Sequence, residues 1–179
     1  MFWTVRKNLT FPDNLFDLSI TMMAIMYLPD PTKALKQLYR ITKPGGKCFI
    51  TTWNSTETKS MGEKVLKRLR GCPYLTDRPV KFWDPEMEDP EYLISEMQKV
   101  GFKGARAERK LVFARYQDGD EGIDLAMQLA PVLLNRFIDF RDDFEKEEYE
   151  RLWREEFGRR QMNGGLQIKM WANIVWGTK

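Results

Sequence analysis

Three side chains in the first third of the chain lie where α/β proteins commonly perform their chemistry. Trp53 and Asn54 follow an apolar run typical of a buried strand, and Tyr27 lies at the entrance of a predicted helix. Ligand sites of parallel α/β sheets form beyond the carboxyl ends of the strands, so these three are the candidate catalytic residues. For Tyr27 the alternative is packing at the surface. The chain has six Trp and eleven Phe, which suggests a core or pocket built from flat rings.

The chain contains no histidine, so acid–base chemistry within one subunit would fall to Asp, Glu, Lys, Tyr or Cys. This excludes Ser-His-Asp and Cys-His triads and histidine-ligated metals. Cys48 and Cys72 are too few and too far apart for a zinc site or a disulfide framework. We therefore expect no metal and a reduced, cytoplasmic location.

The elements that would position the candidate residues alternate between strand and helix. The run 16–23 predicts a buried parallel strand, and Asp30-Pro31 is a typical helix start. A turn at Pro44-Gly45-Gly46 leads into a second strand over 47–53. A strand–helix–strand unit is right-handed, which makes its two strands parallel.

The later elements follow from helix caps and apolar periodicity. They are a helix beginning at Ser60, a helix from Pro90 to Gly101, a strand over about 106–113, helices over 122–140 and 142–160, and a last strand from Leu166 to Trp176.

Three motifs share an order and spacing that resembles the second half of a class I S-adenosylmethionine-dependent methyltransferase of the small-molecule type. They are Leu9-Thr-Phe-Pro-Asp-Asn-Leu-Phe-Asp-Leu18, Met26-Tyr-Leu-Pro-Asp-Pro31 and Lys43-Pro-Gly-Gly46. The resemblance implies a truncated Rossmann-like α/β fold of about four strands, parallel except for an antiparallel last strand. It also implies a single domain over 1–179, with a helical cap at about 118–163 over the substrate pocket.

The same resemblance supplies candidate binding residues. The S-adenosylmethionine contacts would be Leu9, Thr10 and Phe11 near adenine, and Thr21, Met22 and Met23 near the transferring methyl group. The substrate pocket would include Trp83, Met127, Phe137 and Trp171, and for Trp83 the alternative is packing at the surface. The family's glycine-rich cofactor loop lies upstream, and although the chain has 12 glycines, it has no Gly-x-Gly. The cofactor-binding half is therefore expected to be absent, and core packing is the alternative role for Phe11 and the two methionines.

Partners follow from charge and from the predicted sheet edge. The net charge is +3 with both signs interleaved, so nucleic-acid binding is not expected, and no apolar run is long enough for a membrane span. Without the family's first strands, strand 16–23 becomes an exposed apolar edge, and helix 122–140 is richer in apolar residues than one face requires. We expect a homodimer through these two segments.

Three functions fit these observations. The preferred hypothesis is a cofactor-independent enzyme that cyclises or isomerises a hydrophobic small molecule, such as an intermediate of secondary metabolism. The second is an S-adenosylmethionine-dependent small-molecule methyltransferase whose cofactor half comes from a dimer mate, a partner or a longer chain. The third is a non-catalytic partner subunit of an intact methyltransferase.

Overall fold

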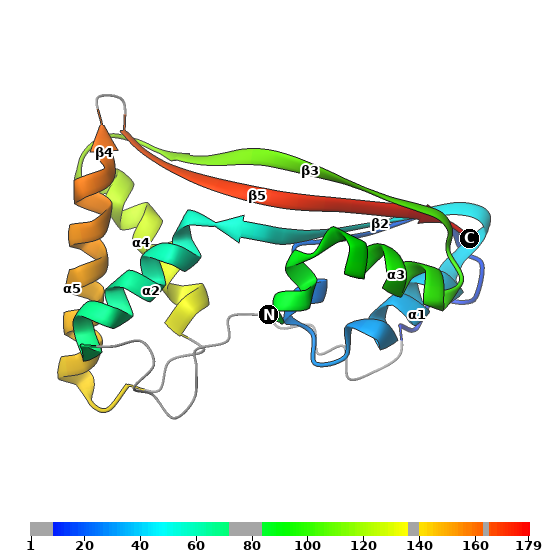
Figure 1. The fold of residues 1–179 in the computed structure, drawn as a ribbon, viewed down its shortest axis with the longest axis horizontal. Coiled ribbons are helices and arrows are strands. Elements are labelled where there is room, and N and C mark those ends of the chain that lie inside the picture. Colours follow the sequence, from blue (N-terminus) through cyan, green and yellow to red (C-terminus); the bar gives the residue numbers. More distant parts are fainter. Residues whose placement is uncertain (1–8, 72–83, 136–139, 163–164) are drawn as a thin grey trace. The chain divides into compact units, whose positions relative to one another are not determined.

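The computed structural model describes residues 9–71, 84–135, 140–162 and 165–179 (Figure 1). Their contacts group into two compact units. In the described part, the first unit holds residues 9–54, 84–110 and 171–179, and the second holds 55–71, 111–135, 140–162 and 165–170. In these ranges no helix is both long and apolar enough to cross a lipid bilayer.

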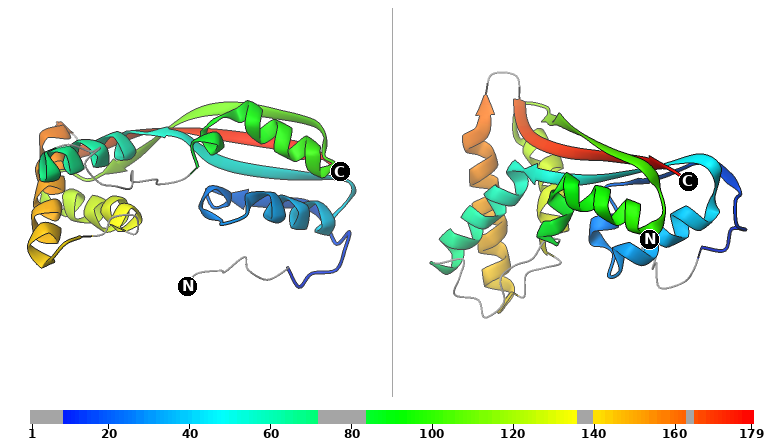
Figure 2. Two further views of the ribbon diagram at one scale, coloured as in Figure 1. Left: turned by 60° about the horizontal axis from the view of Figure 1, so that its bottom comes forward. Right: turned by 45° about the vertical axis from the view of Figure 1, so that its right-hand side comes forward.

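A mixed sheet runs through the chain in the order β1-β2-β5-β3 (Figure 2). Its long strands are β1 (Phe16–Met22), β2 (Thr42–Thr56), β5 (Gly165–Thr178) and β3 (Lys103–Tyr116), and the short β4 (Gln161–Met162) pairs with β5. β1 and β2 are parallel, with Met22 opposite Thr51. Backbone bonds between Gly45, Gly46 and Lys179, at 2.8 and 3.0 Å, join the start of β2 to the end of β5, so β5 is antiparallel to β2. The predicted α/β fold with a mixed sheet of about four strands is confirmed, with β1 and β2 parallel and the last strand antiparallel to β2.

One predicted turn is wrong. Pro44, Gly45 and Gly46 belong to β2 instead of preceding it. The bonds to Lys179 hold this segment in the sheet, so β2 begins at Thr42 and the strand predicted over 47–53 is only its middle. The register between β1 and β2 shifts between Phe16 and Leu18, which accommodates the irregular segment.

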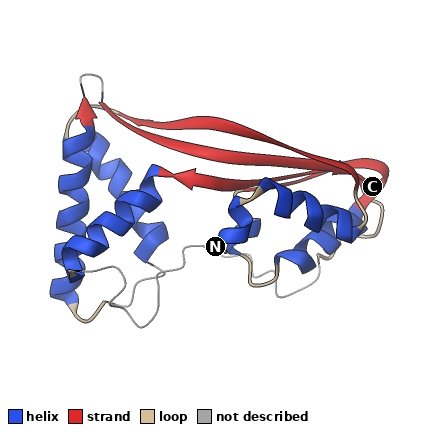
Figure 3. Cartoon of the chain, in the orientation of Figure 1, coloured by secondary structure: helices blue, strands red, loops and turns tan. Residues whose placement is uncertain are grey.

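Two helices of the first unit pack on one side of the sheet (Figure 3). The side chain of Asp30 caps α1 (Pro31–Ile41) by accepting from the Lys33 N–H at 2.8 Å. Asp89 caps α3 (Pro90–Val100) in the same way. Both predicted helix starts are confirmed, because an aspartate cap followed by proline satisfies the first turn locally. Two short 3₁₀ turns, η1 (Ile25–Tyr27) and η2 (Pro85–Glu88), complete the unit.

Three helices form the second unit: α2 (Glu57–Arg70), α4 (Asp120–Asn135) and α5 (Asp143–Arg160). α2 begins three residues before the predicted start at Ser60, because Thr56 is the cap and accepts from the Lys59 N–H at 3.0 Å. Ser60 instead lies inside the helix and donates to the Glu57 carbonyl. Tyr149, Trp153 and Phe157 of α5 are fully buried and form the aromatic core of this unit.

A nearly buried ion pair joins α2 to α5 in the second unit. The Arg70 guanidinium donates to both carboxylate oxygens of Glu145, at 2.8 and 3.2 Å, and the two side chains are 10% and 11% exposed. The Arg141 N–H also donates to Glu145 at 2.7 Å. The Arg70 hydrogen bond is the main cause that lowers the pKa of Glu145, although desolvation opposes it.

Replacing Glu145 by Gln should lower the free energy of unfolding by about 3 kcal/mol, because the nearly buried guanidinium of Arg70 loses this carboxylate. The lowered pKa means that Glu145 contributes stability above its unfolded-state pKa of about 4.3 and loses it as pH falls through the folded value. The wild type should therefore lose more stability on acidification than Glu145→Gln. Urea denaturation at neutral and acid pH measures both effects, with the exposed Glu147→Gln as control. Equal losses in the two variants would contradict the prediction.

Candidate functional site

The end of β1 carries an unusual backbone conformation. Met23, directly after the strand, has φ of 47°, in the left-handed region that non-glycine residues seldom adopt. Its N–H donates to both the hydroxyl and the carbonyl oxygen of Thr51, at 2.9 and 3.1 Å. Backbone strain of this kind persists only where neighbouring bonds impose it, and it is often found at functional sites. The carboxyl end of β1 is thus held in one strained geometry by β2.

Two of the candidate catalytic residues meet at this end of the sheet. The side chains of Tyr27, in η1, and Trp53, in β2, are hydrogen-bonded, and the Trp53 N–H of the backbone donates to the Met26 sulfur at 3.4 Å. Burial is the main cause that raises the pKa of Tyr27, and the hydrogen bond with Trp53 opposes it. The Tyr27 hydroxyl therefore stays protonated at neutral pH. It is suited to donate a hydrogen bond and is a poor general base.

Asn54 has a different environment. Its amide nitrogen donates to the Glu88 carbonyl at 2.7 Å, and buried Asn173 donates to the same carbonyl at 3.0 Å. Thr52 donates to the Met87 carbonyl at 2.9 Å and accepts from Asn173 at 3.3 Å. Together these bonds tie η2 to β2 and β5, so the donor of Asn54 has a structural partner.

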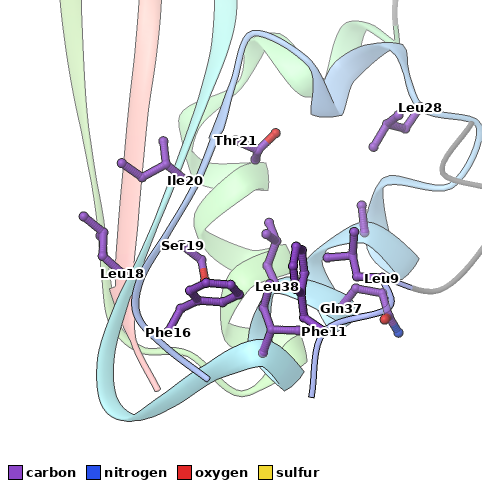
Figure 4. A pocket seen from close by; sticks show the side chains of 12 residues that line it. Leu9, Phe11, Phe16, Leu18, Ser19, Ile20, Thr21, Leu28, Gln37 and Leu38 are labelled. Atoms are coloured by element: carbon purple, nitrogen blue, oxygen red, sulfur yellow. The ribbon is translucent and has the colours of Figure 1, made fainter. Parts of the chain in front are cut away.

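A largely apolar pocket of about 360 Å³ lies beside β1, between the strand, α1 and the segment 9–11 (Figure 4). Its lining residues are uncharged; they are Leu9, Phe11, Phe16, Leu18, Ser19, Ile20, Thr21, Leu28, Ala34, Gln37, Leu38 and Ile41. The structure thus brings together Leu9, Phe11 and Thr21 from the predicted cofactor contacts, whereas Thr10, Met22 and Met23 do not line the pocket.

Arg40, in the last turn of α1, holds the outer wall of this pocket. Its guanidinium donates to the backbone carbonyls of Leu9 and Phe11, at 2.8 and 2.7 Å, and to the Asp13 carboxylate at 2.6 Å. Phe11 then packs edge-on against Phe16, with the ring centroids 5.2 Å apart. Sequence analysis missed Arg40. Its only signal was a basic residue at a helix end, which ordinarily indicates an interaction with the last carbonyls of the helix.

The predicted substrate-pocket residues that the structure describes are Met127 and Trp171. Met127 is on α4 in the second unit, and Trp171, which is 40% exposed, is on β5 in the first unit. Neither residue lines the pocket beside β1. Trp83 and Phe137 fall outside the described residues.

Known proteins resemble the part of the chain that builds the pocket. Residues 4–50 match the family model described as a methyltransferase domain. Over these residues the chain is methyltransferase-like. An uncharacterised methyltransferase of Schizosaccharomyces pombe, C1B3.06c, is 53% identical over 39 residues, which cover 22% of this chain and 14% of that protein. The ubiquinone/menaquinone biosynthesis C-methyltransferase UbiE of Pseudoalteromonas translucida is 41% identical over 51 residues, or 28% of this chain and 20% of that protein.

The methyltransferase-like segment thus aligns with no more than a fifth of the length of these two relatives. Among solved structures, the YcgJ protein of Bacillus subtilis superposes with a TM-score of 0.48 and 14% sequence identity, over 96% of this chain and 67% of that one.

The strained backbone of Met23 leads to a prediction about stability. Met23→Gly should raise the free energy of unfolding by about 1 kcal/mol, because glycine adopts a positive φ without steric cost. Met22→Gly should lower the free energy of unfolding by about 1 kcal/mol. Met22 is extended within β1, so a glycine there relieves no strain and only increases the backbone entropy of the unfolded state. Chemical denaturation of the two neighbouring variants tests the difference in sign. A loss of similar size in both would show that the Met23 side chain outweighs its backbone strain.

Proposed function

We propose that the chain is part of an S-adenosylmethionine-dependent methyltransferase that acts on a small molecule. One observation carries the proposal: the matched residues 4–50 are those that form β1, α1 and most of β2. The matched residues include all the lining residues of the pocket beside β1 named above and also Tyr27, whereas Trp53 follows just after them on β2. Similarity to methyltransferases is therefore concentrated on the candidate site.

The pocket fits one part of the cofactor. Its apolar lining and the Phe11 ring suit the adenine, and Thr21 provides a hydroxyl toward the end of β1. Among the described residues no carboxylate lines the pocket to bind the ribose hydroxyls, and the sequence has no Gly-x-Gly for a close backbone approach. Under this proposal a dimer mate, a partner or further chain supplies those contacts. When bound, S-adenosylmethionine supplies an electrophilic methyl group.

The chain's own contribution to transfer would be to hold the acceptor. Trp53 offers a flat apolar surface, and the protonated Tyr27 hydroxyl can donate to an oxygen of the acceptor. Holding the acceptor in line with the methyl group provides much of the rate enhancement in such a reaction. An aromatic acceptor that carries a hydroxyl or carbonyl oxygen fits both groups. The relative named for ubiquinone and menaquinone biosynthesis is consistent with that class.

The comparisons do not support the preferred hypothesis from the sequence, a cofactor-independent cyclase or isomerase. The curated relatives above are both named as methyltransferases. A measurement of turnover distinguishes the proposed methyltransferase from the third hypothesis, a non-catalytic partner subunit.

Cofactor binding is the first test. Titration of the 179-residue chain with S-adenosylhomocysteine in a calorimeter should give a Kd in the micromolar range. Phe11→Ala should weaken binding about tenfold, because a stacked ring against a base is worth about 1–3 kcal/mol. Phe144→Ala, which removes a ring that is 75% exposed in the second unit, is the matched control and should leave the Kd unchanged. Absence of heat at millimolar ligand would contradict a cofactor site on these residues.

Turnover is the second test. With a radiolabelled methyl group and a panel of phenols and quinols, the wild-type chain should label an acceptor, and Tyr27→Phe should lower kcat about a hundredfold through loss of one hydrogen-bond donor. Tyr92→Phe, on α3, is the control and should retain activity. Binding without labelling of any acceptor would favour the partner-subunit hypothesis. Equal rates for the two variants would remove Tyr27 from the site.

A further inference from the structure

We infer that Arg40 is a positioning residue for the cofactor: its guanidinium fixes the place of the Phe11 ring, and through that ring it raises the affinity for the adenine group. This role rests on the proposed function for the identity of the ligand. Three observations carry it: the hydrogen bonds of the guanidinium, the backbone bonds that continue the same attachment, and the exposure of Phe11.

The guanidinium of Arg40 uses all five of its N–H groups. Two bonds go to the main-chain carbonyls of Leu9 and Phe11, at 2.8 and 2.7 Å, and one goes to the Asp13 carboxylate at 2.6 Å. The other two go to the side-chain oxygen of Gln37, at 3.2 and 3.1 Å. Acceptors on α1 and on the preceding segment therefore hold the planar group in one orientation.

Backbone bonds continue this attachment toward β1. The Asn14 N–H donates to the Arg40 carbonyl at 3.0 Å, and the Leu15 N–H donates to the Ile41 carbonyl at 2.8 Å. The side chain of Arg40 thus holds the first half of segment 9–15, and the backbone at the end of α1 holds the second half. The last turn of α1 fixes the course of the whole segment.

The Phe11 ring depends on this attachment because burial holds it only in part. The residue is 46% exposed, and its ring packs edge-on against Phe16, with the centroids 5.2 Å apart. A half-exposed ring gains correspondingly less from the hydrophobic effect, so the course of its backbone has a large part in deciding where the ring lies. Phe11 and Gln37 both line the pocket beside β1 (Figure 4).

The ring in turn links Arg40 to the ligand. A side chain that must be ordered on binding lowers the affinity, whereas one that is already held in place does not. Because each N–H of Arg40 has an acceptor within the chain, its effect on adenine is indirect and passes through Phe11.

Lysine cannot make the same attachment. Its ammonium is a compact charge on a flexible chain, whereas the guanidinium presents its donors in a fixed fork that reaches the Leu9 and Phe11 carbonyls together. Arg40→Lys therefore keeps a positive charge near Asp13 but loses the fork. This substitution separates the positioning of the segment from the charge.

A double-mutant cycle in a calorimeter tests the role of Arg40, with S-adenosylhomocysteine as the probe. Arg40→Lys should raise the Kd about tenfold, as expected for Phe11→Ala, because both take the stacking ring out of its place. The double variant should raise the Kd no further, because a residue that acts through Phe11 has no effect once the ring is gone. Arg154→Lys, which alters an exposed ion pair with Asp124 in the second unit, is the matched control and should leave the Kd unchanged.

Measurements on the wild type distinguish a failure of the proposed function from a failure of this role. No heat from the wild type at millimolar probe would contradict the proposed function and the ligand named here. Binding by the wild type with an unchanged Kd for Arg40→Lys would contradict the role of Arg40 alone. So would effects of the two substitutions that add in the double variant, since they would show that Arg40 does not act through Phe11.

Fluorine NMR checks the positioning without a ligand. With para-fluorophenylalanine incorporated in place of Phe11, the signal should be shifted from that of the free amino acid by the neighbouring Phe16 ring. Arg40→Lys should move the signal toward the free value, and Arg154→Lys should not. Gln37→Met removes the acceptor of two guanidinium bonds, so it provides a second variant that should move the signal in the same direction. A signal that responds to neither variant would show that other contacts hold the ring, and it would overturn the role of Arg40.

Discussion

The parallel pairing of β1 with β2 is the constraint on which the candidate site depends. Parallel strands bring their carboxyl ends to the same edge, so Tyr27 after β1 and Trp53 near the end of β2 can meet. The same pairing places Thr51 beside Met23 and imposes the left-handed backbone there. Because β2 is also bonded to β5, the geometry at this end is shared by three strands.

The surroundings of β1 are asymmetric. On one side of the strand, Ser19 bonds to Thr42 at 2.7 Å, and the chain before the strand is held to α1 by Arg40. On its other side, Ile20 and Met22 are exposed. The strand is thus anchored through one side.

Aromatic and polar groups have different roles in the two units. In the first unit, Tyr27 and Trp53 are partly exposed at a strand end, where a ligand can reach them. In the second unit, Tyr149 and Trp153 are fully buried in a helical core. Burial raises the pKa of Tyr149 to about 12, as expected of a core tyrosine. Exposure at a strand end, more than ring content alone, distinguishes the candidate site.

Local signals determined much of the fold. Asp30-Pro31 and Asp89-Pro90 predicted two helix starts, because a cap satisfies the first turn with residues adjacent in sequence. The exception was Ser60, where Thr56 upstream offered a competing cap. Apolar runs likewise located the strands, although β2 and β3 extend further than predicted, because pairing with neighbouring strands sets strand ends.

The candidate site, like the fold, was predicted only in part from the sequence. The sequence by itself determined that Leu9, Phe11, Thr21, Tyr27 and Trp53 flank strand ends, since that follows from order along the chain. Only the tertiary structure decided that Arg40 anchors the segment before β1, that Trp53 bonds Tyr27, and that Met23 is strained. These contacts join residues more than 20 positions apart, and no local pattern encodes the distance between such residues once the sheet has formed.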